Sequence, residues 1–137
     1  MILYRPVGVG ELRLIAQAEF RAFPPRLPDQ PIFYPVLTLE YARRIARDWN
    51  TGDAQSAFAG FVTRFEIDAV TAQRYPVQMA GGRSHEELWV PADDLSDFNA
   101  HIVGMITVVE AFTGERFAGV LNPSTLLPLD FDVATHS

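Results

Sequence analysis

Residues 60–67 read Gly-Phe-Val-Thr-Arg-Phe-Glu-Ile, and their side chains alternate between two sides. One side is apolar apart from a threonine and consists of Phe61, Thr63, Phe65 and Ile67. The other side carries a valine and two charged residues. A period of two residues with one apolar side is typical of a strand that packs one face against a core. The stretch therefore predicts a half-buried strand, and the rest of the chain must supply its neighbours and its cover.

Weaker patterns on both sides of this stretch predict the remaining elements. Helical spacing of apolar residues predicts helices over residues 11–20 and 39–49, the second capped by Thr38, and an acidic first turn predicts one over 93–102. β-Branched and aromatic runs predict strands, at residues 2–5, 32–36, 76–79, 87–90 and 105–112. Strands and helices do not alternate regularly, so we expect an α+β fold with a small, mainly antiparallel sheet and about three helices.

The length of 137 residues is that of one domain. We expect a single domain over residues 1–137, and the apolar residues after position 119 indicate that the segment 113–137 packs on its body. The longest apolar run, residues 102–109, is far shorter than the ~20 residues of a membrane helix. The first residues do not form a basic segment followed by an apolar one, so we expect a cytoplasmic protein without a membrane partner.

Composition excludes several kinds of chemistry. The chain has neither cysteine nor lysine, which excludes disulfides, thiol catalysis, Schiff bases and a P-loop. A net charge of −6 disfavours attraction to nucleic acid. The three histidines form no ligand pair at helical spacing, so we expect no metal site. Carboxylates, arginines, aromatic rings and hydroxyl groups remain available for chemistry.

Glu87 is a candidate for catalysis because it follows a glycine-rich loop and begins a predicted strand, Glu-Leu-Trp-Val-Pro. A carboxylate on a rigid strand beside a mobile loop can be directed at a substrate. Strand alternation puts Glu87 on one face with His85 and Trp89. The alternative interpretation is a solvated acid that protects the edge of a sheet from aggregation.

Arg5 and Tyr34 are candidates for ligand binding. Arg5 ends the first predicted strand, and a guanidinium can clamp a phosphate through two parallel hydrogen bonds. The alternative is a surface arginine whose stem covers apolar area. Tyr34 lies in a proline-rich connector, where its ring can stack on a flat ring such as nicotinamide or adenine, whereas we expect the neighbouring Phe33 in the core.

These pieces together resemble the ADP-ribosyltransferase fold. The pieces are Tyr4-Arg5 on a first strand, Phe33-Tyr34 before a helix, and Glu87 at the start of a strand that ends in proline. That family places an Arg or His, a Ser or Tyr, and a Glu on three separate strands around NAD⁺. Over about residues 1–112 the chain also looks like a small bacterial family often labelled ADP-ribosylation/crystallin J1. The resemblance implies a split antiparallel sheet and an NAD-dependent mono-ADP-ribosyltransferase.

The resemblance also implies roles for individual residues. Glu87 would be the catalytic group, stabilising an oxocarbenium-like transition state as nicotinamide leaves. Arg5, Tyr34 and Tyr4 would bind NAD⁺, with Arg5 on the pyrophosphate or the adenosine ribose. These roles require Arg5 and Glu87 to face one cleft between the first strand and the strand of Glu87.

The loop before Glu87 would meet the acceptor through Gly82, Arg83 and His85. His85 stands where many family members carry Gln or Glu, so the acceptor, a macromolecule or a small molecule, stays open. NAD⁺ hydrolysis is an alternative to transfer. A non-catalytic nucleotide- or protein-binding module of the same fold is an alternative from another class. An antitoxin or a second copy of the chain are further possible partners.

Overall fold

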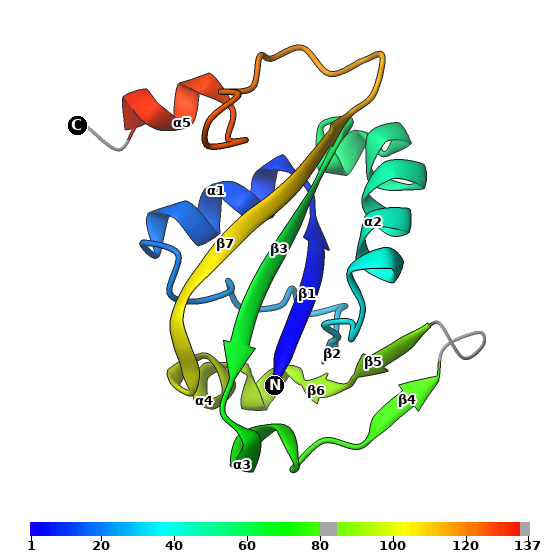
Figure 1. The fold of residues 1–137 in the computed structure, drawn as a ribbon, viewed down its shortest axis with the longest axis vertical. Helices are drawn as coiled ribbons and strands as arrows, with labels where there is room; N and C mark the ends of the chain where they lie inside the picture. The colour runs from blue at the N-terminus through cyan, green and yellow to red at the C-terminus, as the bar shows by residue number, and fades with distance from the viewer. Residues whose placement is uncertain (80–84, 135–137) are drawn as a thin grey trace.

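The largest sheet has three antiparallel strands (Figure 1). β3 (Ala59–Ile67) lies between β1 (Ile2–Val7) and β7 (Ile102–Thr113). The structure, a computed structural model, describes residues 1–79 and 85–134, with side chains as far as residue 131. The alternating stretch 60–67 is thus the central strand. The predicted α+β fold with a small antiparallel sheet is confirmed.

Short pieces of strand continue this layer beyond β1. Tyr4 and Val36 exchange two backbone hydrogen bonds of 2.9 and 2.7 Å, and Val36 in turn lies opposite Glu87 of β5 (Glu86–Leu88). β4 (Val77–Met79) pairs with β5, and β2 (Ile32–Phe33) pairs with β6 (Val90–Pro91). Three segments far apart in the sequence, around residues 4, 36 and 87, are therefore neighbours in one layer.

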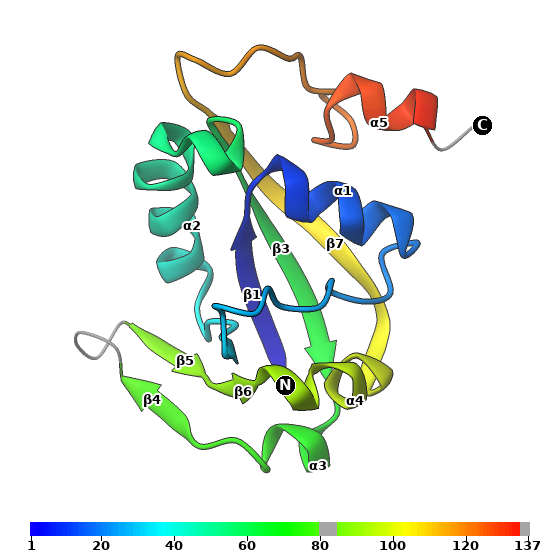
Figure 2. The ribbon, with the colours of Figure 1, turned by 180° about the vertical axis from the view of Figure 1, so that it is seen from behind.

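Helices pack on both faces of the layer. α1 (Val9–Gln17) and α4 (Leu95–Ala100) bury apolar side chains in the main core, together with Leu3, Phe61 and Phe65 of the sheet. α1 crosses behind β3 and β7 in Figure 1 and in front of them in Figure 2. α2 (Leu39–Asp48) packs beside β1 on the other face, in a smaller cluster with Val62.

Side chains at the helix starts act as the caps that the backbone requires. The hydroxyl of Thr38 accepts a hydrogen bond from the backbone nitrogen of Tyr41 at 3.1 Å, which confirms the predicted cap of α2. Asp68 accepts from the backbone nitrogen of Thr71 at 2.8 Å and caps α3 (Ala69–Ala72). Each cap satisfies an amide that has no partner inside the helix.

Some predicted boundaries are wrong for identifiable reasons. The strand expected over 32–36 has two paired residues and an isolated bridge at Val36, because Pro35 has no amide hydrogen to donate. The helix expected over 93–102 is the 3₁₀ turn η3 (Ala92–Asp94) followed by the short α4. Residue 102 already belongs to β7, which is longer than expected.

Part of the C-terminal segment packs on the main core. Leu121 and Pro128 form an isolated bridge that folds the segment back on itself, and α5 (Leu129–Ala134) follows. Phe131 of this helix is buried in the main core. None of the helices within residues 1–79 and 85–134 has the length and apolar character needed to cross a bilayer.

Candidate functional site

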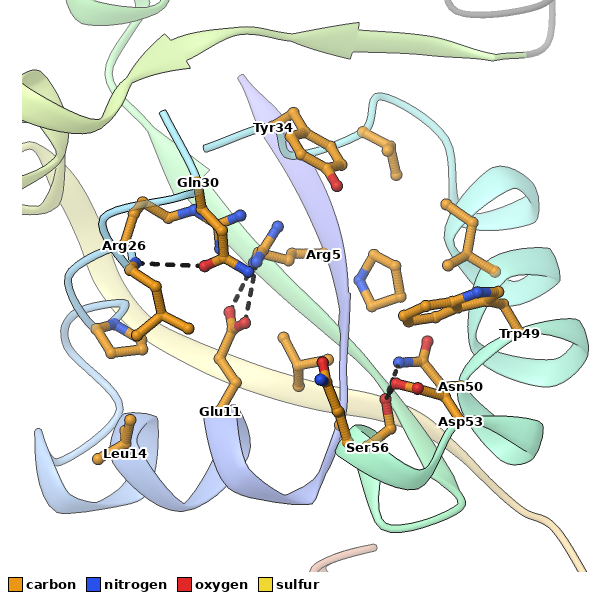
Figure 3. Close-up of a pocket in the computed structure, with 18 of the residues that line it drawn as sticks. Arg5, Glu11, Leu14, Arg26, Gln30, Tyr34, Trp49, Asn50, Asp53 and Ser56 are labelled. Carbon is orange, nitrogen blue, oxygen red and sulfur yellow. Dashed lines mark hydrogen bonds and ion pairs between the residues drawn. The ribbon is translucent and has the colours of Figure 1, made fainter. Parts of the chain in front are cut away.

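A pocket of about 460 Å³ opens beside the edge of β1 that follows the Tyr4–Val36 bridge (Figure 3). Pro6 lies on this edge, where its missing amide hydrogen costs no pairing. The other walls are the start of α1, the connector of residues 24–30, and the end of α2 with the turns η1 (Asn50–Gly52) and η2 (Ala54–Ser56). The volume lies within the roughly 300–1,000 Å³ that small-molecule sites occupy.

Arg5 points into this pocket and is paired with Glu11. Its Nε and Nη2 donate to the two carboxylate oxygens of Glu11 at 2.7 and 2.9 Å. Its guanidinium carbon also lies 4.7 Å from the centre of the Phe33 ring. Glu11 stands in the first turn of α1, where a carboxylate also interacts favourably with the helix dipole. The pair therefore fixes the start of α1 against β1, and the positive charge of Arg5 is already balanced by Glu11.

The guanidinium of Arg26 reaches the same pocket without a carboxylate partner. Its Nε donates to the backbone oxygen of Ile32 at 3.1 Å, and it takes part in no ion pair within the described ranges. Burial, and secondly the charge of Arg5, lower the pKa of Arg26 from its usual value. Arg26 therefore has donors and positive charge available for an anionic ligand.

Two exposed aromatic rings stand at the sides of the pocket. Tyr34 lies near both arginines, with its ring centre 5.9 Å from the guanidinium carbon of Arg5 and 6.0 Å from that of Arg26. Trp49, at the end of α2, is 60% exposed and stands on the far side of Arg5 from Arg26 (Figure 3). Phe33 is buried, as predicted, and Tyr34 is exposed. Such rings are suited to stacking on a planar ligand.

Buried polar side chains line the wall next to Trp49. Asn50 Nδ2 donates to Ser56 Oγ at 2.9 Å, and Ser56 Oγ donates to Asp53 Oδ2 at 2.6 Å. Asn50 Oδ1 has no hydrogen-bond partner in the part of the chain that is described. A Cβ on Gly8 would come within 2.5 Å of the Cα of Ser56, so this wall packs directly on the start of α1.

Glu87 is held rigidly in the layer next to β1. Its side chain is 7% exposed, and its two oxygens accept hydrogen bonds from the Tyr41 hydroxyl at 3.1 Å and from Trp89 Nε1 at 2.7 Å. Burial and the charge of Glu87 raise the pKa of Tyr41 to about 12, so this hydroxyl stays a donor at neutral pH. The interpretation of Glu87 as a solvated edge acid is therefore wrong, while the shared face with Trp89 is confirmed.

The structure does not bring Arg5 and Glu87 together. Tyr4, Val36 and Glu87 lie opposite one another on adjacent strands, so their side chains share the face that α2 covers. Arg5 follows Tyr4 in β1, and its side chain is on the opposite face. Arg5 and Tyr34 line the pocket together with Val36, whereas Tyr4 and Glu87 do not. This pocket is therefore not the cleft shared by Arg5 and Glu87 that the sequence predicted.

The residues expected to meet an acceptor are described only in part. Gly82 and Arg83 lie outside the described residues. The ring of His85 packs on that of Tyr41 with 4.6 Å between centres, and its Nε2 lies 3.4 Å from Arg44 Nη1. His85 is therefore adjacent to the tyrosine that holds Glu87.

Sequence reasoning missed the residues that make the pocket polar, namely Arg26, Glu11, Asn50, Asp53 and Ser56. The end of a strand and two glycines separate Arg5 from Glu11, and no sequence pattern links the two residues. The turn Asn50-Thr-Gly-Asp53 has the composition of a helix end, which by itself gives no sign of a binding site. One signal was available for Arg26, because it stands among five prolines in a segment rigid enough to hold a side chain in place.

Comparison of the chain with protein-family models, with curated proteins and with solved structures gave no match. Among the described residues no three acidic or histidine side chains are grouped closely enough to hold a metal ion. A functional assignment therefore depends on the chemistry of the pocket and of Glu87.

Proposed function

We propose that the chain binds NAD⁺ in the pocket beside β1 and transfers its ADP-ribose unit to an acceptor, with Glu87 as the catalytic residue. The observation that carries the proposal is the place of Val36, which lines the pocket and lies directly opposite Glu87. Neighbouring strands are about 4.8 Å apart, so a single strand spacing separates the pocket wall from the strand of Glu87. The resemblance to ADP-ribosyltransferases supports the same assignment. The proposal also includes the cytoplasmic location that is expected from the sequence.

In this proposal Arg26 takes the role that the resemblance assigns to Arg5. Two parallel donors of a guanidinium match the oxygens of a pyrophosphate, and Arg26 forms no ion pair within the described residues. Arg5 acts through Glu11 as a positioning residue that holds the start of α1. Tyr34 stacks on the nicotinamide end of the ligand, next to Val36.

Glu87 contributes a fixed negative charge to the reaction. The bond between ribose C1′ and the nicotinamide nitrogen breaks, and nicotinamide leaves with the electron pair. Positive charge then develops on the ribose, where a nearby carboxylate lowers the barrier. The acceptor forms a new bond to C1′ and releases its proton to solvent. Tyr41 and Trp89 keep the carboxylate in one orientation, so no reorganisation is needed during the step.

A non-catalytic nucleotide-binding module is the second candidate. The observation in its favour is that Glu87 does not line the pocket and that both of its oxygens are already engaged. The two candidates share the ligand site and differ only in the fate of the bond to nicotinamide.

A titration with NAD⁺ tests the site that both candidates share. Saturation at 100 times the Kd is expected to stabilise the wild-type chain by about 2.7 kcal/mol in thermal unfolding. Arg26→Gln is expected to weaken the affinity about tenfold, because a charge-assisted contact is lost. Arg21→Gln, an exposed arginine outside this pocket, is the matched control. An NAD⁺ effect that is absent, or equal in both variants, would refute the assignment of this pocket.

Nicotinamide release then separates the two candidates. Wild type and Glu87→Gln are each incubated with NAD⁺ and with protein, nucleic-acid and small-molecule acceptors, and free nicotinamide is measured. Transfer predicts release by wild type only, with NAD⁺ binding retained in the variant. Equal release by both chains would remove Glu87 from catalysis. Binding without release by either chain would favour the module.

A further inference from the structure

The polar side chains next to Trp49 have a fixed hydrogen-bond direction. A serine hydroxyl has a single hydrogen, and Ser56 donates it to Asp53 Oδ2 at 2.6 Å. Ser56 Oγ can then only accept, and Asn50 donates to it from Nδ2 at 2.9 Å. A flipped amide would set two acceptor oxygens against each other. The oxygen of Asn50 is therefore turned away from Ser56, as Figure 3 shows.

Two acceptor oxygens remain unused at this end of the pocket. Asp53 engages Oδ2 with Ser56, and its Oδ1 receives no hydrogen bond within residues 1–79 and 85–134. Asn50 Oδ1 also lacks a donor there, although Asn50 is only 4% exposed. A buried acceptor without a donor is destabilising and is rare in native proteins. Asn50 Oδ1 thus marks a place for a donor, and Asp53 Oδ1, on a half-buried side chain of the same pocket wall, is a second acceptor.

An aromatic face stands beside these acceptors. Trp49 precedes Asn50 in the chain, lines the same pocket and is exposed. An exposed indole offers a stacking surface for a planar base. A base stacked there would present its edge to the wall formed by Asn50 and Asp53.

We infer that Asp53 and Asn50 form a base-selecting subsite, which accepts the two hydrogens of an exocyclic amino group on a 6-aminopurine stacked on Trp49. A 6-oxopurine would set its carbonyl oxygen against the same two acceptors and is therefore rejected. Asn50 Oδ1 is shielded from water in the free chain, so the inference requires that this oxygen become accessible when the base binds.

This inference rests on the proposed function and adds the orientation in which NAD⁺ would lie in the pocket. The adenine of NAD⁺ lies at the Trp49 end, and the pyrophosphate meets Arg26. The nicotinamide end then extends toward Tyr34 and Val36, which is the side of the pocket next to Glu87.

Calorimetric titrations with AMP and IMP test the subsite. Wild type is expected to bind AMP about tenfold more tightly than IMP, since the oxo group leaves two acceptors without donors. Asp53→Asn is expected to abolish or reverse this preference, because an amide can donate to the 6-oxo group. Asp48→Asn is the matched control, an exposed aspartate that pairs with Arg47 on α2. Thermal unfolding shows whether each variant is folded. The comparison of AMP with IMP on the wild-type chain does not depend on any variant.

The outcomes for this inference and for the proposed function can be told apart. Equal affinity for AMP and IMP, or binding of neither, overturns the subsite, and the NAD⁺ titration then decides the proposed function alone. A preference for AMP that Asp53→Asn leaves intact also overturns it. A preference for AMP that the variant removes supports the subsite, even when NAD⁺ itself fails to bind and the proposed function is refuted.

Discussion

Glutamine in place of Glu11 is expected to destabilise the fold by about 3 kcal/mol. The change leaves Arg5, whose side chain is 8% exposed, facing a neutral amide, and it removes one of two hydrogen bonds of 2.7 and 2.9 Å. Loss of one partner from a buried ion pair costs about 3–5 kcal/mol, whereas exposed pairs contribute about 0–1 kcal/mol. Glu11 is 22% exposed and the amide keeps one acceptor, which places the expected loss at the lower end of the buried range.

Urea denaturation followed by circular dichroism measures this loss as a change in the free energy of unfolding. Glu40→Gln is the matched control, because Glu40 pairs with Arg43 at 2.8 Å on an exposed helix surface and should lose less than about 0.5 kcal/mol. The double variant Arg5→Met with Glu11→Met should be more stable than either single variant, because no unpaired charge is left in the core. Equal losses for Glu11→Gln and Glu40→Gln would refute the reasoning and return Arg5 to the list of free ligand-binding groups.

Three other changes test the wall of the pocket, the support of Glu87 and the C-terminal segment. Gly8→Ala should destabilise the chain by about 1–3 kcal/mol and weaken AMP binding, because its Cβ would meet the Ser56 backbone; unchanged denaturation and titration curves would contradict this. Tyr41 should ionise at about pH 12 in a tyrosinate absorbance titration, and Glu87→Gln should lower that value by removing a neighbouring charge. Because the folded pKa lies above the unfolded value of 10.0, the stability from neutral Tyr41 is complete below pH 10.0 and declines as the pH rises to about 12. Phe131→Ala should cost about 3 kcal/mol in urea denaturation, and a loss below about 1 kcal/mol would show that the segment is not part of the core.

Elements with a local cause could be predicted from the sequence. The alternation in residues 60–67 follows from one buried face, and the structure shows Arg64 and Glu66 exposed between buried neighbours. The cap at Thr38 requires only a hydroxyl three residues before an unpaired amide. Even the exposure of Tyr34 beside the buried Phe33 follows from the alternation of side chains along an extended backbone.

Boundaries and partners depend on contacts that no local pattern records. β7 begins at Ile102, three residues before the predicted strand 105–112, because β3 pairs with it as far as Ile67 and Ile102. The polar wall of the pocket arises where the turn after α2 meets Gly8 at the start of α1. Segments more than forty residues apart meet there, and only the packing of α2 on the sheet sets their distance.

The amino-acid sequence by itself determined which chemical groups are present, and it identified Arg5 and Glu87 as the charged residues that strands hold in place. The tertiary structure alone decided that they do not meet. Tyr4, rather than Arg5, lies in register with Val36 and Glu87, and successive residues of a strand point to opposite faces. A shift of one residue in strand pairing changes the face of every side chain, and register is set by packing across the whole sheet. For that physical reason Arg5 pairs with Glu11, and the unpaired cation of the pocket comes from the connector at Arg26.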